Sequence, residues 1–249
     1  MQRLYVILAA GCSVLISGTA RANLISNGSF ETPVVTTGSF DIFATGSTGI
    51  TGWTVTGPPG KEVAVVSTAF SQNGVLFNAE DGNQWLDLTG LSANSTEGLT
   101  QTVTTTPGTR YALTFFVGNT TGGGIFGTTS SVIVKVNGAA AGTFTNSNAA
   151  PASLNWQQFT ETFTAAGTST AIEFDNDDPA SDNSNGLDNV DLEVAPTAVP
   201  EPSPATAALS GLLALLAAAG FRARRSRHDS TAGLSLKPAP ASPSIGAGN

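Results

Sequence analysis

The residues that most often perform enzyme chemistry are scarce in this chain and lie near its ends. The only histidine is His228 and the only cysteine is Cys12. A Ser–His or Cys–His nucleophile and a His-ligated zinc site therefore cannot be built in the middle of the chain. The side chains left for chemistry there are carboxylates, which act in pairs or bind hard cations, and aromatic groups that can stack on a ligand.

Carboxylates dominate the charge of the middle of the chain. Between Asn23 and Ala198 there are 16 acidic and three basic residues, a net charge of 3 − 16 = −13. This excludes nucleic acid as a partner, because a phosphate-binding surface needs a cationic patch. A two-carboxylate glycosidase needs only two Asp or Glu side chains a few ångströms apart, and it remains a third hypothesis although no pair stands out.

The densest acidic segment runs from Asp175 to Gly186 and contains Asp177, Asp178 and Asp182. It lacks the Asp-x-Asp-x-Asp-Gly spacing and the bidentate Glu of an EF-hand, so that site is excluded. An irregular calcium loop stays open as an alternative. A solvated acidic loop is the interpretation we favour.

Carbohydrate binding would use exposed aromatic rings beside amide and carboxyl groups that bond to hydroxyls. Tryptophan is mostly buried in small domains, so a structural role is favoured for each of the three in the middle of the chain. Asn83-Gln84-Trp85 is the best candidate for an exposed carbohydrate-binding site. The full candidate set is Trp53, Trp85 and Trp156, with Asn83, Gln84 and Asp87 as polar neighbours.

The elements that must position these side chains are β-strands, because apolar residues alternate with polar ones and no helical period occurs. In one example, Val132, Val134 and Val136 alternate with residues that include Lys135. About eight short strands separated by Gly, Asn and Pro predict an all-β fold, a jelly-roll β-sandwich. The predicted strands are Glu62–Ser67, Gln84–Leu88, Leu99–Thr105, Arg110–Gly118, Ser131–Asn137, Gln157–Thr164, Thr170–Asp175 and Asn189–Val194.

Four long interruptions are too polar or too rich in glycine to form a core, and we expect them as loops at the ends of the sandwich, where binding usually occurs. They are Gly38–Gly49, Ala69–Asp81, Thr120–Thr129 and Asp175–Gly186.

Residues 1–22 are predicted to be a signal peptide. Arg3 precedes an apolar run from Leu4 to Ile16, and Ala20-Arg21-Ala22 offers an A-x-A cleavage site. A first core helix and a lipoprotein site that ends at Cys12 are weaker alternatives, the latter because apolar residues continue past the cysteine. Export would leave the mature chain without cysteine, so its fold must hold without a disulfide.

The C-terminal segment combines a turn, an apolar run and a basic cluster. The apolar residues 205–221 would span roughly 25 Å as a helix, short of the ~30 Å hydrocarbon core. The run is apolar on all faces, which favours a marginal transmembrane helix over an amphipathic one. Clustered arginine stays cytoplasmic, so the domain before it is expected outside. The flanking residues are Pro200, Glu201 and Pro202 before the run, and Arg222, Arg224, Arg225 and Arg227 after it.

Residues 196–227 resemble the PEP-CTERM sorting signal of exopolysaccharide-producing Gram-negative bacteria, which has these three parts in this order. The resemblance implies a membrane-anchored precursor that is recognised by an exosortase-type membrane protease or transpeptidase. It also implies release to the cell surface or the extracellular matrix. Residues 228–249 depart from the family pattern, since its members usually end after the arginines, and we expect a disordered tail there.

Residues 23–195 resemble galactose-binding-like jelly rolls, most closely the choice-of-anchor C family of bacterial surface proteins. More distantly they are similar to calcium-containing xylan- and cellulose-binding modules. The motifs that carry the resemblance are the opening from Asn23 to Glu31, Gly52-Trp53, the run from Asp81 to Leu88, and the closing run from Leu187 to Leu192.

The jelly-roll resemblance implies that the opening and closing segments lie side by side and hold a structural Ca²⁺. The carboxylates that match are Glu31 and Asp188. Calcium prefers six to eight oxygen ligands, and joining the two ends of a sandwich would stabilise it without disulfides. The alternative is that both side chains are solvated at the ends of the sheets.

Together these features predict an exported, non-enzymatic protein of the cell surface or extracellular matrix. The first hypothesis adds binding of extracellular polysaccharide. The rival hypothesis is a purely structural matrix or surface component without a glycan site.

Overall fold

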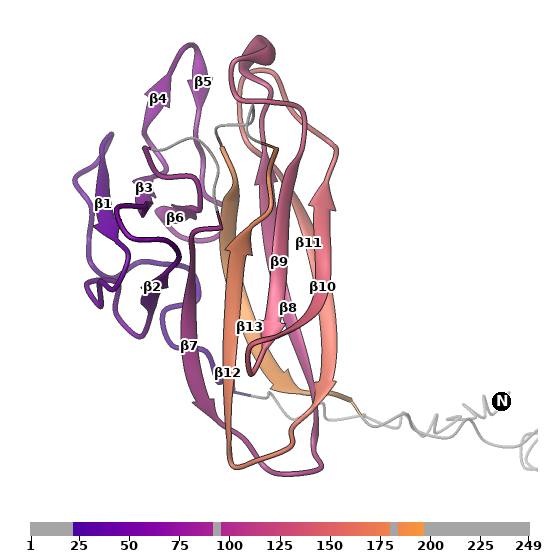
Figure 1. Cartoon of the computed structure of the whole chain (residues 1–249). Helices are drawn as coiled ribbons and strands as arrows, with labels where there is room; N and C mark the ends of the chain where they lie inside the picture. The colour runs from indigo at the N-terminus through magenta and orange to yellow at the C-terminus, as the bar shows by residue number, and fades with distance from the viewer. Residues whose placement is uncertain (1–21, 92–95, 180–183, 197–249) are drawn as a thin grey trace, which may run out of the picture. The chain divides into compact units, whose positions relative to one another are not determined.

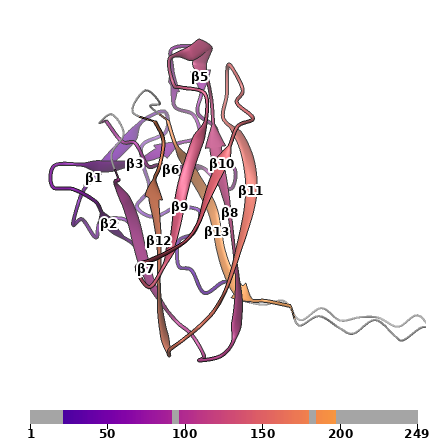
Figure 2. The same cartoon turned by 45° about the vertical axis from the view of Figure 1, so that its right-hand side comes forward.

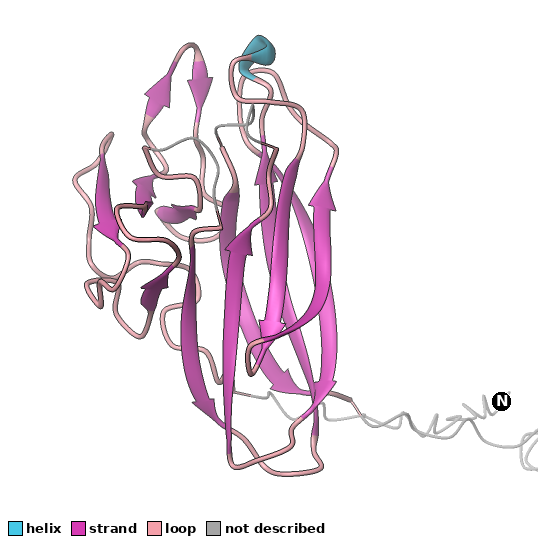
Figure 3. Cartoon of the chain, viewed as in Figure 1, coloured by secondary structure: helices cyan, strands magenta, loops and turns pink. Residues whose placement is uncertain are grey.

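A computed structural model of the chain describes residues 22–91, 96–179 and 184–196, and these form an all-β domain (Figures 1 and 3). The one helical element among them is a single 3₁₀ turn, η1 (Gly122–Gly124). The strands are β1 (Phe40–Ala44), β2 (Thr54–Thr56), β3 (Glu62–Ser67), β4 (Ser71–Gln72), β5 (Val75–Leu76), β6 (Gln84–Asp87), β7 (Gly98–Thr104), β8 (Arg110–Asn119), β9 (Ser130–Val136), β10 (Ala139–Asn146), β11 (Asn155–Thr164), β12 (Ser169–Asn176) and β13 (Gly186–Val194).

The strands build two antiparallel sheets that face each other (Figures 1 and 2). The six-stranded sheet has the order β1-β3-β6-β13-β8-β11, and the five-stranded sheet has the order β10-β9-β12-β7-β2. A separate hairpin pairs β4 with β5. Neighbours in each sheet are mostly distant in sequence, which is the connectivity expected of a jelly-roll sandwich.

The main core fills the space between the sheets and follows the predicted alternation. Leu113 and Phe115 of β8 and Val132 and Val134 of β9 are all fully buried and belong to one hydrophobic cluster. Phe159 of β11 packs against this cluster from a partly buried position. Each Å² of apolar area that these alternate side chains remove from water stabilises the fold by about 25 cal/mol, and this burial is the main force that holds the sandwich together.

All eight predicted strands are present, with ends shifted by no more than three residues. Five further strands were missed. β1 lies within the predicted loop Gly38–Gly49, and the β4–β5 hairpin lies within Ala69–Asp81, so neither segment is wholly irregular. β10 is an edge strand of Ala, Thr and Gly whose residues are mostly exposed. Phe144 is its one large apolar side chain, so β10 shows no apolar period that a sequence pattern could reveal.

A second hydrophobic cluster lies on the outer face of the six-stranded sheet. In β3, Val63 and Val65 face the main core, whereas Ala64 and Val66 belong to the second cluster. Successive side chains of a strand point to opposite faces, so the second cluster is on the far side of the sheet from the main core. A sheet edge that is apolar on both faces needs a second cover, and the segments around β4, β5 and η1 contribute to it.

Residues 1–21 and 197–249 lie outside the described residues. They contain nearly all of the predicted signal peptide (1–22) and sorting signal (196–227), and the whole tail (228–249). Within the described ranges, no helix is long and apolar enough to cross a membrane.

Candidate functional site

The outer face of the six-stranded sheet contains an aromatic pocket of about 90 Å³. One wall comes from β3 and β6, through Ala64, Val66 and Trp85, and the remaining walls come from β1 and the covering loops. We define the aromatic pocket by its lining residues, which are Phe40, Ala64, Val66, Phe70, Gln72, Phe77, Trp85, Asp87, Gly90, Leu91 and Phe126.

The aromatic rings of the pocket support one another by direct contact. Phe77 stacks on Trp85 with ring centroids 6.0 Å apart, and Phe126 meets Phe77 edge-on at 5.2 Å. Phe40 and Phe70 form a further edge-on pair at 5.2 Å. Such pairs add about 0.5–1.5 kcal/mol each beyond the burial of their area, so the pocket is largely pre-formed.

Two side chains give the aromatic pocket a polar character. Gln72 is an exposed residue at the end of β4. Asp87 ends β6, and its Oδ1 accepts bonds from the backbone N–H (3.0 Å) and hydroxyl (2.7 Å) of Thr89 and from the backbone N–H of Asn185 (3.2 Å). Burial raises the pKa of Asp87 to about 6 despite these hydrogen bonds. Its carboxyl can therefore donate or accept a hydrogen bond near neutral pH.

The structure corrects our expectation of an exposed site at Asn83-Gln84-Trp85. Trp85 is fully buried, and its indole N–H donates to the Phe77 carbonyl at 3.0 Å. Gln84 is also buried, and its amide N–H groups donate to the carbonyls of Phe30 and Pro33. Only Asn83 is exposed. Alternation in β6 places Trp85 on the outer face, where the second cluster covers it, so it forms a wall of the aromatic pocket instead of an open stacking platform.

The other tryptophans have structural positions, as favoured from the sequence. Trp53 lies in the main core and donates its indole N–H to the Asn27 carbonyl at 3.1 Å. Trp156 is half-buried against the second cluster, meets Trp85 edge-on at 5.9 Å, and donates to the Asn78 carbonyl at 2.9 Å.

The opening and closing segments lie side by side, as the jelly-roll resemblance implies. The backbone N–H of Leu24 donates to the Leu192 carbonyl at 2.9 Å, and that of Val190 donates to the Gly28 carbonyl at 3.0 Å. Gly28 is required by this close approach, because a Cβ there would fall 2.0 Å from the Val190 oxygen. β13 carries a bulge between Asp188 and Asp191, where the extra residue changes the direction of the strand.

Glu31 and Asp188 both bind the backbone of the same short segment, Glu80–Gln84. The Glu31 Oε1 accepts from the N–H groups of Asn83 (2.6 Å) and Gln84 (2.8 Å). The Asp188 Oδ2 accepts from the N–H groups of Glu80 (2.8 Å) and Asp81 (3.1 Å). Asp188 is fully buried, so the alternative of a solvated carboxylate does not hold for it, whereas Glu31 is half-buried.

These contacts bear on the predicted calcium site. Carboxylate oxygens suit Ca²⁺, but the oxygens named above already accept bonds from backbone N–H groups. In the part of the chain that the structure describes, no group of three or more His, Cys, Asp or Glu side chains gathers that could hold a metal. A calcium ion would therefore need backbone carbonyls and water to complete its ligands. Calcium at Glu31 and Asp188 stays a prediction.

The acidic segment from Asp175 onward is only partly the solvated loop that the sequence favours, because Asp177 is exposed whereas its neighbours on β12 are buried. Asp175, Asn176 and Asn185 are buried, and the Asn185 side-chain amide donates to the Asn176 Oδ1 at 2.7 Å. The backbone N–H of Ser131 donates to the Asp178 Oδ1. Residues 180–183, which include Asp182, lie outside the described residues.

Sequence reasoning did not find the aromatic pocket, apart from Trp85 and Asp87. Phe70, Gln72 and Phe77 fall in a segment that is predicted as a loop, and Phe126 falls in another. A partial signal exists, because two phenylalanines in one polar interruption are unusual for a solvated loop. Which face of which strand these rings cover depends on contacts between distant segments.

The chain belongs to a family whose description reads "Protein of unknown function (DUF642)", and the match covers residues 23–193. No curated protein sequence matches the chain. The family match begins at the first residue of the opening segment and ends one residue after the closing segment with which it pairs in the structure.

Solved structures with a similar fold include a cyclase from Fischerella sp. TAU. It is 20% identical, with a TM-score of 0.53, and the match covers 72% of this chain and 100% of the cyclase. A second structure is the Stig cyclase Fisc from the same organism, in complex with (3Z)-3-(1-methyl-2-pyrrolidinylidene)-3H-indole. It is 20% identical, with a TM-score of 0.52, and the match covers 72% of this chain and 100% of the cyclase. The CBM22-1 xylan-binding domain of Paenibacillus barcinonensis Xyn10C is 17% identical over 66% of this chain and 99% of its own, with a TM-score of 0.39. The cyclase matches show a shared fold and do not transfer an activity.

Proposed function

We propose that this protein is an exported, non-enzymatic component of the cell surface or extracellular matrix that binds polysaccharide through the aromatic pocket. The observation that carries the proposal is the pocket itself, a pre-formed hollow with stacked rings on its walls and Gln72 and Asp87 among its lining residues. Binding sites for small groups typically combine apolar walls with a few polar groups that fix orientation.

The chemistry of the pocket suits a sugar ring. The C–H faces of a sugar pack on aromatic rings, and its hydroxyls require donors and acceptors at the edge, which an amide and a carboxyl group supply. The pocket is too small for a long stretch of polymer, so the proposal places only part of one sugar ring inside it. Asp87 is the only carboxyl among the lining residues, and Glu97, whose charge contributes to the raised pKa of Asp87, is not part of that lining. Glycoside hydrolysis uses two carboxyl groups that flank the substrate, so the lining supports binding over cleavage.

The proposal includes the route by which the protein reaches its site. The N-terminal signal would direct export, and the Pro-Glu-Pro, apolar and arginine segments would anchor the precursor until an exosortase-type enzyme processes it. The acidic middle of the chain supports an extracellular neutral partner rather than a phosphate polymer. Ca²⁺ at Glu31 and Asp188 is proposed as a structural cofactor that fixes the Glu80–Gln84 segment.

Binding can be tested with Trp85 as an internal reporter. Because its indole forms a wall of the pocket, extracellular polysaccharides and their oligosaccharides should change the tryptophan fluorescence of the full chain in a saturable way. Phe70→Ala and Gln72→Ala should weaken binding about 10-fold or more, since each removes a contact worth roughly 1.4 kcal/mol or more. Thr104→Ala, at an exposed position on the opposite sheet, is the matched control and should bind normally.

Two results would count against this function. Equal binding by Phe70→Ala, Gln72→Ala and the natural chain would show that the polysaccharide binds outside the aromatic pocket. No binding to any polysaccharide on a broad glycan array would favour the structural component without a glycan site. Release of a chromogenic group from aryl glycosides, lost in Asp87→Asn, would instead support the glycosidase hypothesis.

A further inference from the structure

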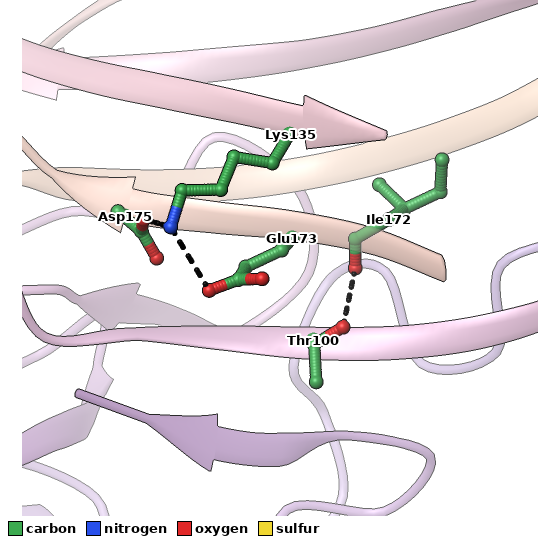
Figure 4. Close-up of polar contacts among 5 residues, drawn as sticks. All are labelled: Thr100, Lys135, Ile172, Glu173 and Asp175. Atoms are coloured by element: carbon green, nitrogen blue, oxygen red, sulfur yellow. Dashed lines mark hydrogen bonds and ion pairs between the residues drawn. The ribbon is translucent and has the colours of Figure 1, made fainter. Parts of the chain in front are cut away.

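The outer face of the five-stranded sheet carries a compact cluster of one lysine and two carboxyl groups (Figure 4). β9 and β12 are antiparallel neighbours, and their register places Lys135 directly opposite Glu173. Asp175 lies two residues further along β12, so it shares this face of the sheet. The Lys135 Nζ lies 3.3 Å from the Glu173 Oε1 and also contacts the Asp175 Oδ2.

Asp175 is unusually well shielded for a residue on an outer face. Its side chain is 4% exposed, whereas those of Glu173 and Lys135 are 21% and 30% exposed. Its partner in the next strand, β7, is Gly98, and a Cβ at that position would fall 2.6 Å from the Asp175 Oδ1. Because Gly98 has no side chain, the Asp175 carboxyl group can occupy the space beside it. Water therefore has little access to the Asp175 carboxyl carbon.

The neighbouring Thr100 hydroxyl bonds outside this cluster. Thr100 pairs with Glu173 across β7 and β12, but its hydroxyl donates to the Ile172 carbonyl at 3.0 Å (Figure 4). The lysine amine is thus held against a shielded carboxyl group, with a second carboxyl group in reach. A fixed amine and carboxyl react as if at very high concentration, and the exclusion of water opposes hydrolysis of the product.

We propose that Lys135 and Asp175 condense to an amide that cross-links β9 to β12, with Glu173 transferring the proton. The neutral Lys135 amine attacks Cγ of the protonated Asp175 carboxyl group and forms the C–N bond. Glu173 takes a proton from the nitrogen and gives it to the departing hydroxyl, which leaves as water when the C–O bond breaks. The products are one amide and one water molecule, and no oxidant or reductant is needed.

The pKa shift of Asp175 favours this reaction, whereas that of Lys135 slows it. Burial raises the pKa of Asp175 to about 6, with a further contribution from Glu173 and an opposing one from Lys135. The hydrogen bond with Asp175 raises the pKa of Lys135, so the amine must first give its proton to a carboxyl group of the cluster. The condensation is therefore a slow maturation step that follows folding rather than a catalytic turnover.

The cross-link would stabilise the domain covalently in the way that a disulfide stabilises other exported domains. The only cysteine is Cys12, so the sandwich has no disulfide of its own. A covalent bond between β9 and β12 closes a long loop, and such closure stabilises a fold chiefly by restricting the unfolded chain. This inference is independent of the proposed polysaccharide binding, because the cluster and the aromatic pocket are on different sheets.

Trypsin offers a direct test, because Lys135 is the only lysine or arginine between Arg110 and Arg222. The full chain is denatured, digested and analysed by mass spectrometry. A condensed Lys135 resists cleavage, so the peptide that ends at this lysine should be absent. A continuous fragment that begins at Tyr111 and lacks the mass of one water should replace it, and fragmentation should locate the link at Asp175.

The variants define what each side chain contributes. Asp175→Ala should restore cleavage after Lys135, and Glu173→Gln should restore it while leaving both reacting groups in place. Cleavage of the natural chain after Lys135, with both peptides at full mass, would show an ion pair only and overturn the proposal. Persistent resistance in Asp175→Ala would overturn it as well, and a water loss that persists in Glu173→Gln would remove the role given to Glu173.

Discussion

At the scale of single residues, buried carboxyl groups decide how this domain responds to pH. Asp188 accepts backbone hydrogen bonds from Glu80, Asp81 and Asn189, yet it is fully buried in the sheet. Burial is the larger effect and raises its pKa from 3.8 to about 8. Its folded form therefore binds a proton more strongly than its unfolded form does.

We predict that the free energy of unfolding falls as pH rises through the pKa of folded Asp188. The stabilisation from the bound proton is complete below pH 3.8 and is lost as the pH approaches 8. Between about pH 6 and 8 the slope should be as large as about 1.4 kcal/mol per pH unit, one proton being linked to folding. Urea unfolding in a calcium-free buffer measures this slope. Asp188→Asn should flatten it, and an unchanged slope in that variant would contradict the assignment.

Calcium provides a separate prediction at the same residue. A bound cation would stabilise ionised Asp188, so added Ca²⁺ should raise the melting temperature and reduce the loss of stability at high pH. EDTA should reverse the effect. Glu31→Ala and Asp188→Ala should each remove the difference between calcium and EDTA. Identical melting curves of the natural chain under both conditions would rule out the site.

At the scale of elements, β6 is the strand on which both faces of the six-stranded sheet depend. Leu86 enters the main core, while its neighbour Trp85 enters the second cluster and the aromatic pocket. The sheet is thus a shared wall between the sandwich core and the candidate binding site. Stability and binding are coupled in this strand, so surface positions of the pocket are the better probes of binding.

We predict that Trp85→Ala lowers the free energy of unfolding by about 3–5 kcal/mol, because it empties a fully buried site. Trp85→Phe keeps most of the volume and loses the bond to the Phe77 carbonyl, so it should cost less. Val34→Ala, where the side chain is 84% exposed, should change stability by less than about 0.5 kcal/mol. Guanidinium unfolding gives all three values. A cost for Trp85→Ala no larger than that for Val34→Ala would mean that the outer face is open.

At the scale of the whole molecule, the proposed export route can be tested through the two terminal segments. Residues 23–193 match one family along nearly the whole sandwich, and both terminal segments lie beyond this match. In the proposed route, the terminal segments would direct the domain to the outside of the cell and would then be removed.

We predict two cleavage points in the protein recovered from its native host, one after Ala22 and one near Pro200–Pro202. The intact mass of the recovered protein determines both. Replacement of Arg222, Arg224, Arg225 and Arg227 by alanine should leave the first cleavage intact and prevent the second, because in the proposed route the arginines would hold the apolar run in its membrane orientation. A full-length, uncleaved chain in the cytosol would refute the export route.

The sequence by itself determined the fold class, eight of the thirteen strands and the acidic, histidine-poor character of the domain. Alternation of apolar side chains is local information, and it is strong wherever a strand buries one face, as in β8 and β9. Only the tertiary structure decided that Gln84 and Trp85 are buried, that β1 and β10 are strands, and that Phe70 and Phe126 line one pocket. It also brought Lys135 against Asp175. Burial on an outer face and contact between strands depend on which distant segments pack together, and that pairing leaves no periodic trace in either segment.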